Sequence, residues 1–109
     1  MNRYQRLKKD IKNEAIIPID VVFMSGDGWY RCVDEDANLM HQLFNIRYSG
    51  GGWGYYYEVS FECVYRSNWI KKIKSEGLTY AFARICDGRT MTREIIRSSD
   101  RTLLHKKFH

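Results

Sequence analysis

Residues 48–66 read YSGGGWGYYYEVSFECVYR, and this stretch decides our expectation for the fold. After the glycines, every second position is apolar or aromatic: Tyr55, Tyr57, Val59, Phe61, Cys63 and Tyr65. The alternate positions hold Tyr56, Glu58, Ser60, Glu62, Val64 and Arg66. A period of two with one apolar face is typical of a half-buried antiparallel strand. The pattern therefore predicts a strand over 55–66 whose first set of side chains lines the core.

The residues before this strand predict a surface loop. Three successive glycines give the connection 49–54 access to positive φ. With the alternate tyrosines in the core, Tyr48, Trp53 and Tyr56 are the aromatic residues expected at the surface. Exposed aromatic rings provide stacking faces for the bases of single-stranded nucleic acid. We therefore treat Trp53 and Tyr56 as candidate stacking residues.

The N-terminal third predicts a helix followed by a hairpin. An apolar stripe at helical spacing is formed by Tyr4, Leu7, Ile11 and Ala15. The sequence AIIPIDVVFM at 15–24 favours a strand, with Pro18 at its beginning or at a sheet edge. SGDG at 25–28 predicts a tight turn, and WYRCV at 29–33 predicts the returning strand.

Residues 34–48 are harder to interpret. DEDAN at 34–38 is expected to form an acidic turn. Residues 38–48 are compatible with either a strand or a helix. The alternation of Phe44, Ile46 and Tyr48 with polar neighbours favours the strand.

The C-terminal half predicts a helix, two strands and a tail. Residues 67–76 favour a short helix that Ser67 or Asn68 caps and Gly77 ends, with Trp69, Ile70 and Ile73 buried. LTYAFARIC at 78–86 favours a strand, and Asp87-Gly88 favours a turn. MTREIIRS at 91–98 favours a partner strand, although Thr90 could cap a helix within 89–97 instead. A candidate C-terminal helix begins at Ser99 or Asp100.

These elements predict an α+β fold with an antiparallel meander sheet of about six strands. Chain order makes the strands largely sequential neighbours, with an N-terminal helix and a helix near 67–76 beside them. The 109 residues are 44% hydrophobic and 28% charged, which is ordinary for a globular protein. We expect one domain over 1–109.

The cysteines and the N-terminus indicate a cytoplasmic protein without a cofactor. Cys32, Cys63 and Cys86 form no CxxC pair and have no histidine at ligand spacing, so we expect neither a disulfide nor a metal site. The opening MNRYQRLKKD lacks the character of a secretory leader, and no segment approaches the length of a membrane span.

The net charge of +5 is unevenly distributed along the chain. Residues 1–14 and 66–109 are basic, with net charges of +3 and +7, whereas residues 15–65 carry −5. A positive face of this kind attracts polyanions, provided that the fold does not interleave the segments.

The function expected from these observations is non-catalytic binding of a polyanion, preferably single-stranded nucleic acid. Phosphates would be held by basic helix faces, and bases would stack on the glycine/aromatic loop. The nucleic-acid-binding residues would be Arg6, Lys8, Lys9, Lys12, Trp53, Tyr56, Lys71, Lys72 and Lys74. The sequence does not distinguish DNA from RNA.

Two alternatives stay open. The first is a small inhibitor or adaptor, of the phage or mobile-element type, that binds a larger nucleic-acid-handling protein complex. Its partner surface would be acidic, formed by Asp34, Glu35, Asp36, Glu58 and Glu62. The second is a metal-free ribonuclease that uses His41 as its acid–base group. Direct nucleic-acid binding requires the lysines of 8–12 and 71–74 to share one face.

Overall fold

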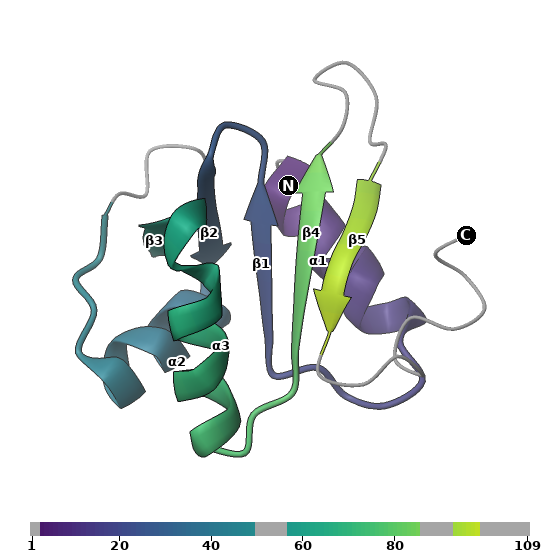
Figure 1. The fold of residues 1–109 in the computed structure, drawn as a ribbon. Coiled ribbons are helices and arrows are strands. Elements are labelled where there is room, and N and C mark those ends of the chain that lie inside the picture. The colour runs from purple at the N-terminus through teal and green to yellow at the C-terminus, as the bar shows by residue number, and fades with distance from the viewer. Residues whose placement is uncertain (1–2, 50–56, 86–92, 99–109) are drawn as a thin grey trace.

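A computed structural model describes residues 3–49, 57–85 and 93–98. In chain order the elements are α1 (Arg3–Glu14), β1 (Val21–Ser25), β2 (Trp29–Val33), α2 (Glu35–Phe44), β3 (Glu58–Glu62), the short 3-10 helix η1 (Cys63–Tyr65), α3 (Arg66–Ser75), β4 (Tyr80–Ile85) and β5 (Arg93–Ser98). The predicted α+β class is confirmed (Figure 1). No helix in the described ranges is long and apolar enough to cross a membrane.

The strands form one mixed sheet, and the predicted six-strand antiparallel meander is wrong. The strand order is β3-β2-β1-β4, and β5 adds to the outer side of β4. β1 and β4 are parallel neighbours, whereas β1–β2, β2–β3 and β4–β5 are antiparallel. A parallel neighbour requires a crossover connection, and α3 lies in the connection that carries the chain from β3 to β4. Chain order therefore does not equal sheet order.

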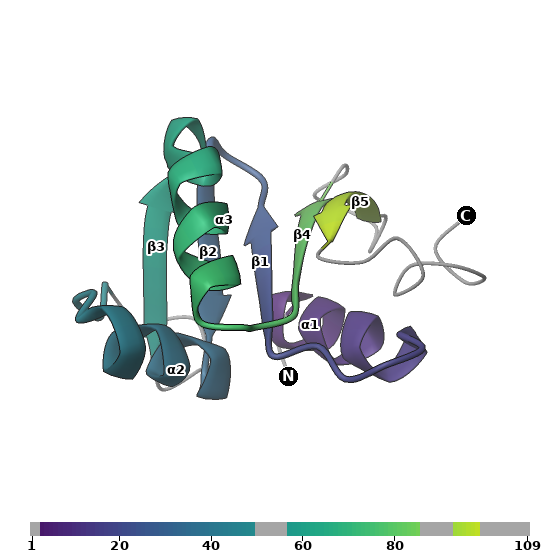
Figure 2. The same cartoon turned by 60° about the horizontal axis from the view of Figure 1, so that its bottom comes forward.

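β1 is the central strand, and all five of its residues are buried. Val22 and Met24 face the cluster that contains α1, whereas Val21 and Phe23 face the cluster that contains residues of α2 and α3. We call these two faces of the sheet the α1 side and the α3 side (Figures 1 and 2). A strand covered on both faces needs apolar residues at every position, which explains the run VVFM.

The predicted N-terminal helix is confirmed as α1, and its stripe packs on the sheet as expected. Tyr4, Leu7 and Ile11 are buried against β1 and β4, with Ala15 packed partly beside them. Figure 2 shows α1 under the part of the sheet that contains β1 and β4. On the same side of β2, Val33 is buried with α1 and Arg31 donates to the Tyr4 hydroxyl over 2.8 Å, whereas Trp29, at the beginning of β2, is half exposed.

The predicted acidic turn at 34–38 and strand at 38–48 are corrected by the structure to one helix, α2. Ala37 and Met40, three positions apart, are buried against the α3 side of the sheet. Two acidic residues in the first turn suit the positive end of the helix dipole. The helix ends at Asn45, whose φ of 57° is the left-handed conformation of a C-terminal cap. The alternation over 44–48 belongs to the residues after the helix.

The strand predicted over 55–66 is correct only in its middle. Val59 and Phe61 are buried, as the alternation predicts, but the strand β3 spans Glu58–Glu62 alone. Tyr57 and Tyr65, which we expected in the core, are 45% and 50% exposed. The chain turns into η1 at Cys63, so the period of two no longer determines burial from there. Tyr55 lies outside the described residues.

The α3 side holds an aromatic core. Phe23 stacks on Phe82 with 4.8 Å between ring centroids, and Phe61 meets Phe23 edge to face at 5.3 Å. The predicted helix near 67–76 is confirmed as α3, with Ile70 and Ile73 buried. Trp69, expected on the buried stripe, is only partly buried.

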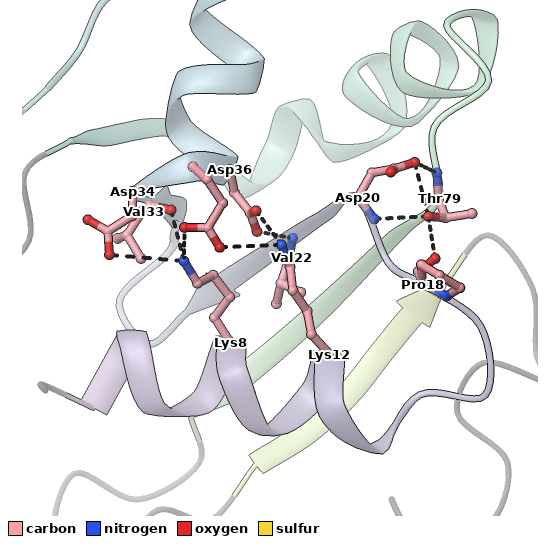
Figure 3. Close-up of polar contacts among 10 residues, drawn as sticks. Lys8, Lys12, Pro18, Asp20, Val22, Val33, Asp34, Asp36 and Thr79 are labelled. Carbon is pink, nitrogen blue, oxygen red and sulfur yellow. Dashed lines mark hydrogen bonds and ion pairs between the residues drawn. The ribbon is translucent and has the colours of Figure 1, made fainter.

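The end of the chain is described only as far as β5. The strand interpretation of MTREIIRS is confirmed for its described part, because Arg93–Ser98 pairs antiparallel with β4. The sheet is fastened at the beginning of β1 and β4. There the amide of Thr79 donates to Asp20 over 2.8 Å, and the Thr79 hydroxyl donates to the Pro18 carbonyl over 2.9 Å (Figure 3). The Asp87-Gly88 turn and the C-terminal helix lie outside the described residues.

Candidate polyanion-binding surface

The two basic helices lie on opposite sides of the sheet. α1 packs on one face through Leu7 and Ile11, and α3 packs on the other through Ile70 and Ile73. Figure 1 shows α3 in front of the sheet and α1 behind it. The lysines of 8–12 and those of 71–74 therefore do not share one face, so the predicted convergence of the two basic helices on one nucleic acid is wrong, and a site of this kind has to be formed by one helix alone.

Lys8 is directed into the protein rather than toward solvent. Its side chain is buried, and Nζ lies 2.9 Å from a carboxylate oxygen of Glu35 and 4.0 Å from one of Asp34. Nζ also donates to the Val33 carbonyl over 3.4 Å. Figure 3 shows this ammonium group between α1 and the chain entering α2. Lys8 joins two elements and is not available to hold a phosphate.

Lys12, one helical turn after Lys8, also forms ion pairs with carboxylates of α2. Nζ donates to Asp36, which is fully buried, and lies 3.7 Å from Glu35. Asp36 also accepts the backbone amide of Val22 over 2.9 Å (Figure 3). Burial raises the pKa of Asp36 to about 6, against the opposing attraction of Lys12. For Glu35, partial burial is outweighed by the hydrogen bond from Lys8, and its pKa is lowered.

The other two predicted residues of α1 stay at the surface. Arg6 and Lys9 are exposed. Lys9 lines an open hollow of about 560 Å³ beside the Lys8–Glu35 pair. Because Lys8 and Lys12 are neutralised internally, α1 contributes less positive charge to the surface than its sequence suggests.

The exposed face of α3 carries the predicted cations intact. Lys71, Lys72 and Lys74 are all exposed, and none forms an ion pair with a carboxylate in the described part of the chain. Lys72 lies over the ring of Trp69, 4.5 Å from its centroid. Tyr65 is half exposed immediately before the helix. This surface, which we call the α3 basic face, consists of Lys71, Lys72 and Lys74 with Tyr65 and Trp69, and its ammonium groups have no carboxylate partner among the described residues.

Two arginines near this face were not among the binding residues that we predicted from the sequence. Arg66, at the beginning of α3, and Arg84, on β4, line one hollow of about 400 Å³ at the β1–β2 turn. Arg66 also donates to the hydroxyl of Tyr30 over 3.1 Å. The alternation of Tyr80 and Phe82 places Arg84 on the α3 side. The alternation along β4 could therefore have predicted the side of the sheet on which Arg84 lies. It could not have predicted that Arg66 lies next to Arg84.

The predicted acidic partner surface divides into two parts. Asp34, Glu35 and Asp36 are held by Lys8, Lys12 and Gln5, so they mainly fasten α1 to α2. Glu58 and Glu62 lie at the two ends of β3: Glu58 pairs with Val33, next to Asp34, whereas the exposed Glu62 pairs with Trp29 at the other end of β2. Of the five carboxylates, Glu62 is thus the one at the far end of β3 from Asp34, Glu35 and Asp36.

His41, the candidate acid–base group, occupies a stack of rings on α2. Its Nδ1 lies 2.7 Å from the Ile46 carbonyl, and its ring stacks on Tyr48 at 4.2 Å. Tyr48 in turn stacks on Tyr57 at 4.7 Å and donates to Asn38 over 2.6 Å. The nearest described groups thus orient the imidazole and hold the end of α2.

Trp53 and Tyr56 lie outside the described residues, so their stacking role stays a prediction.

Of the cysteines, Cys32 is buried, and burial raises the pKa of its thiol. Cys63 is half-buried with its Sγ 3.4 Å from the Ser25 hydroxyl. Among the residues described, no group of three or more His, Cys, Asp or Glu could hold a metal ion.

Comparison with protein-family models and with curated protein sequences gives no match for this chain. Function is therefore inferred from the residues and their geometry alone.

Proposed function

We propose that this protein binds a polyanion without catalysis, preferably single-stranded nucleic acid, through the α3 basic face. The observation that supports this choice is the contrast between the two basic helices. Lys8 and Lys12 form ion pairs inside the protein. On α3, Lys71, Lys72 and Lys74 are exposed and form no ion pair with a carboxylate among the described residues. Exposed cations supply most of the affinity of such proteins.

Aromatic rings beside the lysines favour a single strand over a duplex. In a single strand the bases are accessible, and they stack on aromatic side chains with little dependence on sequence. Tyr65 is half exposed beside α3, and Trp69 lies under Lys72. Trp53 and Tyr56 remain the candidate stacking residues of the preceding loop.

The salt dependence of binding tests the phosphate contacts. We expect affinity for a labelled single strand, measured by fluorescence anisotropy, to fall steeply with salt, with a slope of about −0.7 per phosphate contact. Lys71→Ala should flatten that slope by somewhat under one unit. Lys9→Ala is the matched control, because Lys9 is also an exposed helical lysine but lies on α1. Its slope should equal that of the wild type.

Two results would contradict the proposal. The first is the absence of binding below about 100 μM at 50 mM salt, where even non-specific binders show affinity. The second is an equal loss of slope from Lys9→Ala and Lys71→Ala, which would assign no special role to the α3 basic face.

Ring removal should act differently from charge removal. Trp53→Ala should weaken binding by about 1 to 3 kcal/mol and leave the salt slope unchanged, because stacking releases no counterion. The same anisotropy titrations at several salt concentrations measure both quantities. A change of slope without a change of affinity at low salt would exclude stacking by this residue.

A second candidate function is binding to a protein partner as an inhibitor or adaptor. The observation that favours it is the exposed pair that Trp29, at the beginning of β2, and Glu62, at the end of β3, form on the α1 side. Trp29 is 43% exposed there and lies directly opposite the exposed Glu62 on the neighbouring strand. Exposed tryptophan beside charged residues is typical of interaction surfaces.

A further inference from the structure

β3 is the outer strand of the sheet, and its backbone direction is fixed by two contacts. The Tyr57 carbonyl accepts the Asp34 amide over 3.0 Å, and the Cys63 amide donates to the Gly28 carbonyl over 2.9 Å. Both contacts run from the ends of β3 toward the side on which β2 lies. Because adjacent residues of a strand direct their backbone groups to opposite sides, those of Glu58, Ser60 and Glu62 point outward.

Ser49 covers one end of this edge. Its amide donates to the Glu58 carbonyl over 2.7 Å, and the Ser60 hydroxyl donates to the Ser49 hydroxyl over 3.1 Å. Among the described residues, no backbone hydrogen bond outside the helices reaches the outward groups of Ser60 or the Glu62 amide, whereas the Glu62 carbonyl belongs to the first turn of η1, which Glu62 caps. A row of outward amide and carbonyl groups is a template for another strand.

The side chains at this edge determine which strand it accepts. Glu58, Ser60 and Glu62 face the α1 side, opposite to the buried Val59 and Phe61. The neighbouring cation on β2, Arg31, is engaged by Asp27 at 2.7 Å. The edge is thus lined by carboxylates, with the ring of Trp29 behind Glu62.

We propose that β3 receives an extended segment of a partner protein as an added strand, and that this segment carries Lys or Arg at alternate positions. The proposal rests on the second candidate function and names its partner chemistry. Directly opposed residues on adjacent strands have Cβ atoms about 4.5–5.5 Å apart. A lysine or arginine opposite Glu62 therefore meets its carboxylate, while main-chain hydrogen bonds supply the docking register.

The experiment titrates ¹⁵N-labelled protein with a short blocked peptide of alternating lysine and threonine. We expect amide shifts concentrated at Ser60 and Glu62, with little change on α3. A matched peptide of alternating glutamate and threonine should bind more weakly because like charges oppose it. The lysine peptide N-methylated on alternate residues lacks the donors of one edge and should lose binding.

Variants of the protein separate backbone pairing from charge. Ser60→Pro removes an outward amide that β2 does not use, which an edge strand tolerates, and it should abolish peptide binding. Glu62→Gln should weaken binding about two- to fivefold. Glu76→Gln, which changes an exposed carboxylate after α3, is the control and should leave binding unchanged.

Several outcomes would overturn the proposal: no shift at Ser60 and Glu62 at about 1 mM peptide, equal binding of the glutamate peptide, or unaltered binding by the N-methylated peptide. Native mass spectrometry that shows β3-dependent self-association, lost in Ser60→Pro, would assign the edge to a second copy instead. Nucleic-acid binding is judged separately, because Lys71→Ala should leave peptide binding unchanged and Ser60→Pro should leave the salt slope unchanged.

Discussion

Asp36 is fully buried in the first turn of α2, where its two carboxylate oxygens contact different elements. One accepts the ammonium of Lys12 on α1, and the other accepts the amide of Val22 on β1. An aspartate with the ordinary pKa of 3.8 is ionised near neutral pH, but burial raises the pKa of this one to about 6. The folded state therefore holds the proton more tightly than the unfolded chain does.

Linkage gives the sign of the resulting pH dependence. The stabilising contribution of Asp36 is complete below about pH 4 and is lost as pH rises through 6. Between pH 7 and pH 5 the free energy of unfolding should gain about 1 kcal/mol from this group. Asp36→Asn should remove that gain, as measured by urea unfolding at both pH values. Parallel profiles for wild type and variant would show that Asp36 does not titrate in this range.

Lys8 and Lys12 show why residue-scale prediction failed on α1. Both lysines border the buried stripe of Leu7 and Ile11, yet the sequence presents them only as charges on an amphipathic helix. Their carboxylate partners stand 23 to 27 positions away and become neighbours only when α2 folds beside α1. Charge counting along the chain cannot detect such pairing.

At the scale of elements, β3 depends on one aromatic residue. Phe61 is buried among Phe23, Tyr30 and Trp69, with ring centroids 5.3 to 5.7 Å away. Phe61→Ala should lower the free energy of unfolding by about 3 to 5 kcal/mol because it leaves a cavity. Tyr57→Ala, which removes a half-exposed ring, should lower it by less than about 1 kcal/mol. Denaturant unfolding measures both, and equal losses would mean that the faces of β3 are assigned wrongly.

Elements with a clear period were predictable, and elements without one were not. The stripe of α1 and the hairpin of β1 and β2 were recognised because each has a strong local signal. α2 was missed because alternation after Phe44 was extended backwards into the helix. The unbroken apolar run of β1 signals burial on both faces, but we read it only as a strand.

At the scale of the whole molecule, sheet order was the feature that the sequence could not provide. Local patterns identify strands, but the choice of neighbour depends on where α3 crosses and on which edge of β1 remains for β4. The residues of the candidate site likewise depend on which elements become neighbours in the folded chain. The separation of Lys71 from Lys9 follows from helices packing on opposite faces, and the convergence of Arg66 with Arg84 follows from the β1–β4 pairing.

The contact between Asp20 and Thr79 joins positions 59 apart in the chain. During synthesis β1 therefore leaves the ribosome well before the parallel strand that completes it. All five residues of β1 are buried in the finished sheet, and until β4 arrives one long side of this apolar strand has no neighbour. Such a side pairs readily with other nascent chains. The growing polypeptide is consequently most prone to aggregate in the interval between the two strands, which is when chaperones would be of most use to it.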